Sequence, residues 1–397
     1  MVLYSEQGTP QFLLFFTYLC LCWWTTTTCI HVNAENIHSL KPGDKLNATP
    51  TSVMCSKQGT YCMNFVESRD SETLGYLQMY VQRKDSWVVW IGNRDQPVEI
   101  DSAVLLLDNS GVLKIESKND SKILYSSPQP FNKSTTMVAT LLDTGNFVLQ
   151  DIQPNGMKIM LWQSFDYPTD TLLPGMKLGV NHKTGHKWSL VSWLTHEIQT
   201  SGLFKLEWEP SRRQLIIKYK EQVYWKSKEI EKNNREYKIV SDENEDSLAL
   251  TDPNENLTIW TLLETGKLMS RGKNDIARAD LCYGYKTDDG CQKWGVMPNC
   301  RNHGDVFQYN AGYLRNEMLT DIGNASNNIN DCQTICWSNC SCIGFKNSYG
   351  NGTGCTFILS MESLNIASGG DDYFYILVKS AVHNKGMYQA TTITHHL

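Results

Sequence analysis

Residues 162–179 read WQSFDYPTDTLLPGMKLG and separate two strand-rich halves of the chain. Trp162 and Phe165 are large enough to anchor a hydrophobic core. The two prolines fix φ, and the glycine after the second one allows the backbone to turn. The carboxylates can accept hydrogen bonds from nearby backbone N–H groups. The stretch therefore predicts a corner through which no helix can run. Asp166 and Asp170 are four residues apart, and on such a turn we interpret them as turn-forming carboxylates, not as an acid–base pair.

Length and composition narrow the class of protein. A chain of 397 residues has room for about two to four domains with cores of their own. Its formal net charge of −6, without a basic stripe, argues against a nucleic-acid partner. The 12 tryptophans and 18 tyrosines suit β-sandwiches, prisms and carbohydrate-facing surfaces, although core packing alone accounts for most of them.

The first 34 residues have the features of a secretory signal peptide. The apolar run Phe12–Trp24 has the length of the hydrophobic region of a leader, and Val32 and Ala34 occupy the −3 and −1 positions of a cleavage site. We expect cleavage after Ala34; the alternative is a buried N-terminal helix. After this leader the longest apolar run is Phe374–Val378, which is too short for a membrane span.

Cysteines and glycosylation motifs agree with secretion. Three of the 13 cysteines lie in the predicted leader, which leaves an even ten that can all pair. Seven Asn-x-Ser/Thr sequons are predicted glycosylation sites in surface loops; they begin at Asn47, Asn119, Asn132, Asn256, Asn324, Asn339 and Asn351.

Residues 37–160 read as short strands separated by turns. The segment Leu107–Leu113 is echoed by Leu142–Val148, 35 residues later, as strand, tight turn and strand. Repeated β units that share a core favour a prism or a barrel. Cys55 and Cys62 flank the turn signal Gln58-Gly59, which predicts a cross-strand disulfide; zinc is the lesser alternative, because no second ligand pair lies nearby.

Residues 188–265 also read as short strands, except that the charged segment Lys226–Asp246 predicts a solvated loop. His182 and His186 have i, i+4 spacing, but the glycine between them argues against a helical metal pair, so we predict no metal and no cofactor. The segment from Cys282 to Asp305 is rich in Gly, Asp and Asn, which predicts a loop, and with little apolar content it requires disulfides for its stability.

The segment 331–342 reads DCQTICWSNCSC. Cys332 and Cys336 can lie on one face of a helix, and Cys340 and Cys342 fit a following strand. The same spacing would also suit zinc, although in a secreted chain disulfides are favoured. The chain contains no protein-kinase motifs, no G-x-S-x-G and no H-E-x-x-H, so we predict no catalytic residues and no enzymatic activity.

Five of these stretches resemble the ectodomain of plant S-domain (G-type lectin) receptor-like serine/threonine kinases and the S-locus glycoproteins. They are residues 88–98, 139–151, 162–179, 202–227 and 331–345. The resemblance implies a mainly β fold, in which bulb-type lectin β-prism-like domains precede a disulfide-stapled PAN/apple α+β domain. We expect a signal peptide at 1–34, a bulb-type lectin domain at 35–160, a second lectin-like or S-locus glycoprotein region at 161–265, a cysteine-rich linker (a degenerate EGF-like module) at 266–305, a PAN/apple domain at 306–380 and an unstructured tail at 381–397.

In the PAN/apple domain the resemblance implies the disulfides Cys332–Cys355 and Cys336–Cys342. Cys340 then needs a partner, which the sequence leaves open among Cys282, Cys291 and Cys300.

The sugar pattern of the bulb-type lectins, Q-x-D-x-N-x-V-x-Y, is mostly lost. On the second repeat it falls on Leu142, Thr144, Asn146, Val148 and Gln150, of which only Asn146 and Val148 match. On the first repeat it finds no match. Each missing polar contact costs about 1 kcal/mol or more, so we expect a lectin fold with degenerate mannose sites.

The resemblance implies a non-catalytic recognition module, secreted to the apoplast, or at the plasma membrane if a full-length form exists. It would bind an extracellular glycan or a small cysteine-rich protein and form a homodimer, or a heterodimer with an S-domain receptor kinase, in defence or in the recognition of pollen. Two alternatives are a secreted mannose-binding lectin and a truncated version of a full-length receptor kinase.

Overall fold

The computed structural model describes residues 36–379, except 70, 84–85, 128–135, 196–197, 233–234, 253–257, 272–274, 283–287, 294, 303, 315–318, 323–326, 350–351, 362–363 and 367–371. The predicted leader, the predicted tail at 381–397 and the sequons at Asn132, Asn256, Asn324 and Asn351 lie outside these residues. In the part of the chain that is described, no helix combines the length and the apolar character needed to cross a bilayer.

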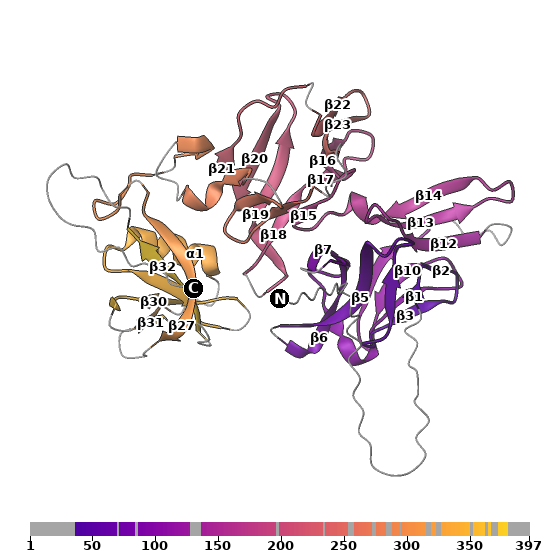
Figure 1. Cartoon of the computed structure of the whole chain (residues 1–397), viewed down its shortest axis with the longest axis horizontal. Coiled ribbons are helices and arrows are strands. Elements are labelled where there is room, and N and C mark those ends of the chain that lie inside the picture. Colours follow the sequence, from indigo (N-terminus) through magenta and orange to yellow (C-terminus); the bar gives the residue numbers. More distant parts are fainter. Residues whose placement is uncertain are drawn as a thin grey trace, which may run out of the picture. The chain divides into compact units, whose positions relative to one another are not determined.

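Three sheets form what we call the first β unit (Figure 1). Their strand orders are β1-β4-β5-β6-β7, with β8 also paired to β6, then β11-β10-β9-β3 and β14-β13-β12-β2. The strands are β1 (Asn36–Ile37), β2 (Ser39–Leu40), β3 (Lys45–Asn47), β4 (Val53–Cys55), β5 (Tyr61–Ser68), β6 (Ser71–Val81), β7 (Trp87–Ile91), β8 (Val98–Glu99), β9 (Val104–Leu107), β10 (Leu113–Glu116), β11 (Ser121–Tyr125), β12 (Thr136–Leu141), β13 (Phe147–Ile152) and β14 (Lys158–Gln163).

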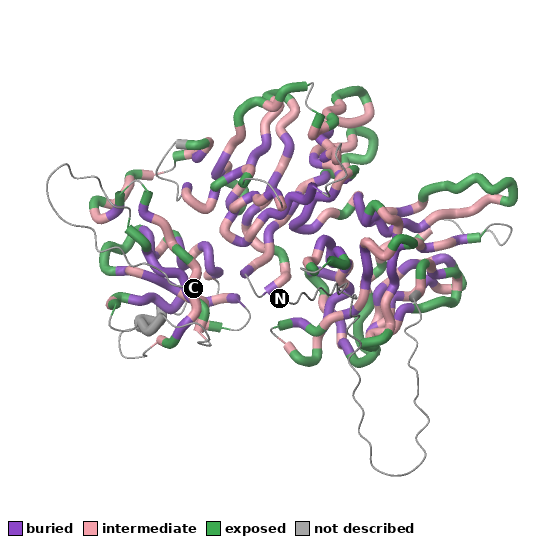
Figure 2. The backbone as a smooth tube through the Cα atoms, in the orientation of Figure 1, coloured by how far each residue is buried: buried purple, intermediate pink, exposed green. Residues whose placement is uncertain are grey.

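Alternating burial explains these strands. In β10 the side chains of Leu113 and Ile115 are buried, while those of Lys114 and Glu116, which alternate with them, are half-exposed. The period of two places one face of each sheet on the core. The outer end of the β13–β14 hairpin departs from this rule, since Met157, Ile159 and Met160 are exposed there (Figure 2).

A second β unit repeats the three-sheet plan after the corner. Its strand orders are β15-β24-β25-β26, β17-β16-β23-β22 and β18-β19-β20-β21. The strands are β15 (Thr171–Leu172), β16 (Lys177–Asn181), β17 (Lys187–Trp188), β18 (Leu190–Trp193), β19 (Ser201–Glu209), β20 (Gln214–Tyr219), β21 (Gln222–Lys226), β22 (Tyr237–Ser241), β23 (Glu245–Leu250), β24 (Trp260–Leu262), β25 (Lys267–Ser270) and β26 (Ala277–Arg278).

The corner itself contains a single 3-10 turn, η2 (Ser164–Asp166). Trp162 is buried and meets Trp90 edge-on, with ring centroids 6.3 Å apart. The Asp166 carboxylate accepts hydrogen bonds from Trp188 Nε1 at 3.1 Å and from Gln163 Nε2 at 3.0 Å. The corner therefore acts as a core anchor, and Asp166 is held by side chains where we expected backbone N–H donors.

The C-terminal part is a six-stranded antiparallel sheet with one α-helix. The strand order is β28-β30-β29-β32-β27-β31. The elements are β27 (Val306–Leu314), β28 (Leu319–Ile322), α1 (Ile329–Ser338), β29 (Gly344–Asn347), β30 (Cys355–Ile358), β31 (Leu364–Ile366) and β32 (Asp372–Val378). The chain is thus mostly β and ends in a disulfide-linked α+β part, which confirms the predicted fold class.

Three local expectations were wrong or incomplete. The segment Lys226–Asp246 is not all loop, because β22 lies within it and pairs with β23; its charges are on half-exposed and exposed positions and hide the strand period. Cys340 and Cys342 precede β29 and do not lie in it. The sheet of β24 continues into β25 and β26, which lie within the predicted cysteine-rich linker at 266–305.

Candidate functional site

Asn146, the one polar match to the sugar pattern, is buried and makes internal contacts. Its Nδ2 donates to Gln163 Oε1 at 2.9 Å. Its Oδ1 accepts from the backbone N–H of Phe165 and from Ser164 Oγ, both at 3.3 Å. The side chain is 8% exposed. The amide therefore holds the turn of the second repeat against the η2 corner, and both of its polar atoms make hydrogen bonds inside the protein.

The neighbouring positions of the pattern lack the polar groups that hold a sugar. Val148 is fully buried, Thr144 is exposed, and Leu142 and Gln150 are half-buried. In the first repeat, Leu107, Leu113 and Ile115 are all buried in the core. Since neither repeat gathers a carboxylate, an amide and a phenol on one strand, the loss of the mannose sites stands as our prediction.

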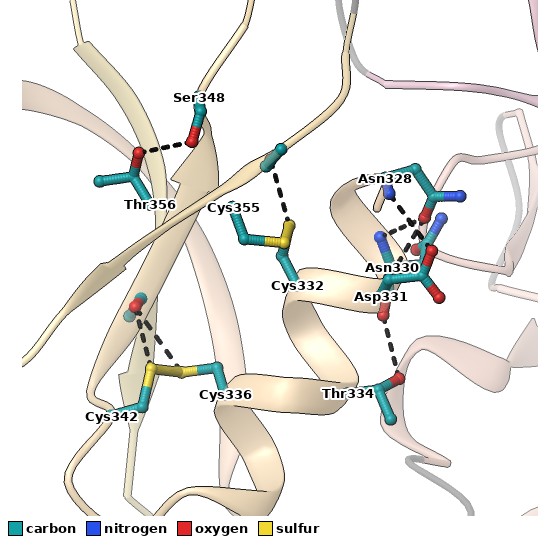
Figure 3. Close-up of a disulfide and its surroundings, with 12 residues drawn as sticks. Asn328, Asn330, Asp331, Cys332, Thr334, Cys336, Cys342, Ser348, Cys355 and Thr356 are labelled. Carbon is teal, nitrogen blue, oxygen red and sulfur yellow. Dashed lines mark hydrogen bonds between the residues drawn. A yellow bond between two sulfur atoms is a disulfide. The ribbon is translucent and has the colours of Figure 1, made fainter. Parts of the chain in front are cut away.

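The structure pairs all ten cysteines that follow the predicted leader. Cys55 and Cys62 face each other across β4 and β5, with Cα atoms 4.0 Å apart. Cys332–Cys355 connects helix α1 to β30, and Cys336–Cys342 connects it to the segment before β29; both pairs are the ones that the resemblance implied (Figure 3). Cys340 pairs with Cys300, which leaves Cys282 to pair with Cys291.

Of the sequons that are described, Asn119 and Asn339 are exposed and Asn47 is half-buried. Asn119 Nδ2 donates to Glu99 Oε1 at 2.6 Å, and Asn339 is the C-cap residue of α1. An exposed amide is accessible to a glycosyltransferase, so these two positions suit the predicted modification, which stays a prediction.

Arg94 joins the two β units. It follows β7, is 6% exposed, and donates to the carbonyl oxygens of Val191 at 2.6 Å, Gln199 at 2.8 Å and, in addition, Ser192. Burial lowers the pKa of its guanidinium, and the nearby Asp170 and Asp95 carboxylates oppose that shift. Beside it, Asp95 accepts from the backbone N–H and the hydroxyl of Ser201 at 2.9 and 3.0 Å. The sequence analysis missed Arg94, although it lies in the motif IGNRDQ.

Helix α1 begins with a capping box (Figure 3). Asn328 Oδ1 accepts from the N–H groups of Asn330 and Asp331, and Asp331 Oδ2 accepts from the N–H of Asn328. The other oxygen of Asp331 accepts from Tyr219 at 3.0 Å and from Lys220 at 2.8 Å, at the end of β20. Burial and the Asp331 carboxylate raise the pKa of the Tyr219 phenol. One side chain therefore starts the helix and attaches it to the second β unit.

The other end of α1 is held by Arg301, which donates to four backbone carbonyls. They belong to Trp337 at 3.0 Å, Cys336 and Asn339 at 2.7 Å, and Cys342 at 2.9 Å. A guanidinium placed over the orphan carbonyls of a helix C-terminus satisfies them and complements the helix dipole. Burial lowers the pKa of Arg301, an effect that Asp305 opposes.

Comparison with known proteins identifies two domain families on this architecture. The D-mannose binding lectin family matches residues 87–194, and the PAN-like domain family matches residues 300–361. The G-type lectin S-receptor-like serine/threonine-protein kinase CES101 of Arabidopsis thaliana is 31% identical over 68% of this chain and 38% of its own length. The S-locus-specific glycoprotein BS29-2 of Brassica oleracea var. alboglabra is 32% identical over 52% of this chain and 45% of its own.

The chain is a homologue of the G-type lectin S-receptor-like kinases and S-locus glycoproteins. It spans less than half the length of these two relatives. Among solved structures, the Japanese Marasmius oreades lectin is similar over 33% of this chain and 92% of its own, at 11% identity and a TM-score of 0.24, which is too low to support an argument.

The lectin match begins at β7 and ends just after β18. It therefore includes Asn146, the corner, and Arg94 with two of its partners, Val191 and Ser192. The PAN-like match begins at Cys300, beside Arg301, and runs through α1 to the residues after β30.

Proposed function

We propose that this chain is a non-catalytic extracellular recognition module that binds a glycan or a small secreted protein and pairs with a receptor kinase of the S-domain class. The observation that carries the proposal is the order of a lectin family and a PAN-like family in one chain whose relatives are receptor kinases and S-locus glycoproteins. Five disulfides suit an oxidising, extracellular setting.

The placement of the charged groups supports a binding role over catalysis. Two of the buried charged residues, Arg94 and Arg301, contact backbone carbonyls and hold the fold together. Catalytic acids and bases instead need a perturbed pKa next to a place where a substrate can bind.

A secreted mannose-binding lectin is the second candidate, favoured by the D-mannose binding lectin match at residues 87–194. The internal hydrogen bonds of Asn146 weigh against it, since a sugar hydroxyl would have to replace them.

Two measurements on the secreted chain test the proposal. A mannose column tests the second candidate. If the chain is retained and elutes with free mannose, and if Asn146→Ala abolishes this retention, the mannose-binding function is favoured. Co-immunoprecipitation with G-type lectin receptor kinases from plant membranes reads the pairing, with an unrelated receptor kinase as the control. Specific capture of the G-type class is expected, and equal capture of both classes would contradict the pairing.

A further inference from the structure

A cavity of about 490 Å³ lies where the first and second β units meet. Gln78 of β6 and Trp87 of β7 line it from the first unit. Trp193 of β18, Asp170 before β15 and Arg271 after β25 line it from the second. This volume is within the range of about 300–1,000 Å³ that is typical of small-molecule sites. The cavity is separate from Asn146 and Val148, which do not line it.

Four polar atoms of its lining residues are buried without a hydrogen-bond partner. They are Trp87 Nε1, Trp193 Nε1, Arg271 Nε and Asp170 Oδ1. Most buried polar atoms in native proteins are paired, and a group of orphans around one cavity is unusual. Asp170 is 3% exposed, and its other oxygen already accepts from Thr171 Oγ1 at 3.1 Å.

These orphans define the chemistry of a ligand. Three of them are donors that need an acceptor, and the carboxylate oxygen needs a donor. Hydroxyl groups both donate and accept, so a polyhydroxylated molecule suits a lining that offers both kinds of group. The charged lining residues, Glu67, Asp170, Glu264, Arg69 and Arg271, nearly balance, which gives no strong preference for an ionic ligand.

The aromatic side chains add the apolar half of such a site. Arg271 lies over the Trp87 ring, with its guanidinium carbon 4.5 Å from the ring centroid. Trp193 contributes a second indole to the wall. Rigid indoles combine a large apolar surface with one polar N–H, which suits a ring that presents C–H groups on its faces and hydroxyls on its edge.

We propose that this inter-unit cavity is a binding site for a neutral saccharide, distinct from the repeat-turn mannose positions. The site is assembled only when the two β units are joined, and Arg94 and Asp95 make that connection. The proposal rests on the proposed recognition function and specifies its ligand class and its place.

The test uses the secreted chain, after enzymatic removal of its N-glycans under native conditions. An array of neutral and uronate-containing oligosaccharides identifies the probe, and titration calorimetry with the strongest neutral one measures its affinity. Trp193→Phe and Arg271→Gln should each lower that affinity at least tenfold. Trp208→Phe is the matched control, because Trp208 Nε1 is also buried without a partner but does not line the cavity, and its affinity should equal that of the wild type.

Arg271 is half-exposed, so Arg271→Gln keeps the test open if Trp193→Phe does not fold. Neutral-saccharide binding that persists in both cavity variants would overturn this site and leave the recognition function intact. Binding of uronates alone would overturn the ligand class. Absence of any saccharide binding, in a chain that still captures a G-type receptor kinase, would overturn the cavity proposal alone.

Discussion

Arg94 Nη1 lies 2.6 Å from the carbonyl oxygen of Val191, 97 residues further along the chain. The same guanidinium donates to the carbonyls of Gln199 and Ser192. One side chain therefore supplies hydrogen-bond donors to three carbonyl oxygens of the second β unit. A planar fork of five donors suits this task, and an ammonium group does not. This buried cation thus connects the two β units, beside the contact between Asp95 and Ser201.

Arg94→Met should lower the free energy of unfolding by about 3 kcal/mol or more, because it leaves several buried carbonyls without a donor. Arg94→Lys should recover only part of this loss. Urea unfolding followed by tryptophan fluorescence measures the effect. Arg212→Met, at an exposed position, is the control and should change stability by less than about 0.5 kcal/mol. Equal stability of the Arg94 and Arg212 variants would refute the role of Arg94.

Asn146→Ala should lower stability by about 1–3 kcal/mol, because Gln163 and the Phe165 N–H lose a buried partner. Asn109→Ala in the turn of the first repeat, where Asn109 is exposed, should be nearly neutral. Thermal unfolding of both variants makes the comparison. If Asn146→Ala kept wild-type stability and lost retention on mannose, Asn146 would be a sugar ligand and not a structural residue.

The stability of the protein should fall at alkaline pH because Tyr61 is buried. Burial raises the pKa of this phenol from an ordinary value near 10 to about 12; Arg83 lowers the pKa and Asp252 raises it. Its contribution to stability is fully present below pH 10 and is lost as the pH rises through about 12, because the unfolded chain loses the proton first. The expected loss is about 2 kcal/mol.

Tyr61→Phe removes that titration and leaves the other alkaline effects unchanged. The difference in unfolding free energy between wild type and Tyr61→Phe should therefore be constant from pH 7 to about 9.5 and shift in favour of the variant above it. Brief urea titrations at each pH keep the disulfides intact. A difference that stays flat up to pH 12 would show that Tyr61 titrates normally.

The sequence predicted elements that its local chemistry determines. Short apolar runs bounded by turn residues predicted strands, such as the one that follows the turn in Leu142–Val148, and the Cys332 and Cys336 spacing predicted a helix, which begins at Ile329. Contacts between segments that are distant in the sequence could not be predicted from it. Nothing local shows that Arg94 meets Val191 or that Asp331 meets Tyr219. The charged residues on either side of Tyr237–Ser241 concealed a strand that forms by pairing with β23. The orphan polar atoms around Trp193 likewise exist only in the assembled fold.

Asp331 offers a test of whether helix α1 is attached to β20 in solution. Asp331→Asn weakens the contact with Tyr219 and Lys220, but it also weakens the capping box, since Oδ2 accepts from the Asn328 N–H. A single variant cannot separate these effects. A double-mutant cycle with Tyr219→Phe can, because the loss of the cap is the same with and without the phenol hydroxyl and cancels.

We expect a coupling free energy of about 1 kcal/mol between Tyr219→Phe and Asp331→Asn, as for a buried hydrogen bond to a charged group that retains Lys220 as a second partner. Urea unfolding of the four proteins gives the cycle. Hydrogen exchange at the first turn of α1 gives an independent readout, since Tyr219→Phe alone should raise exchange there if the contact holds the helix. Tyr313→Phe, at an exposed tyrosine of β27, serves as the control. Zero coupling together with unchanged exchange would mean that α1 is capped by its own residues and is not attached through Asp331.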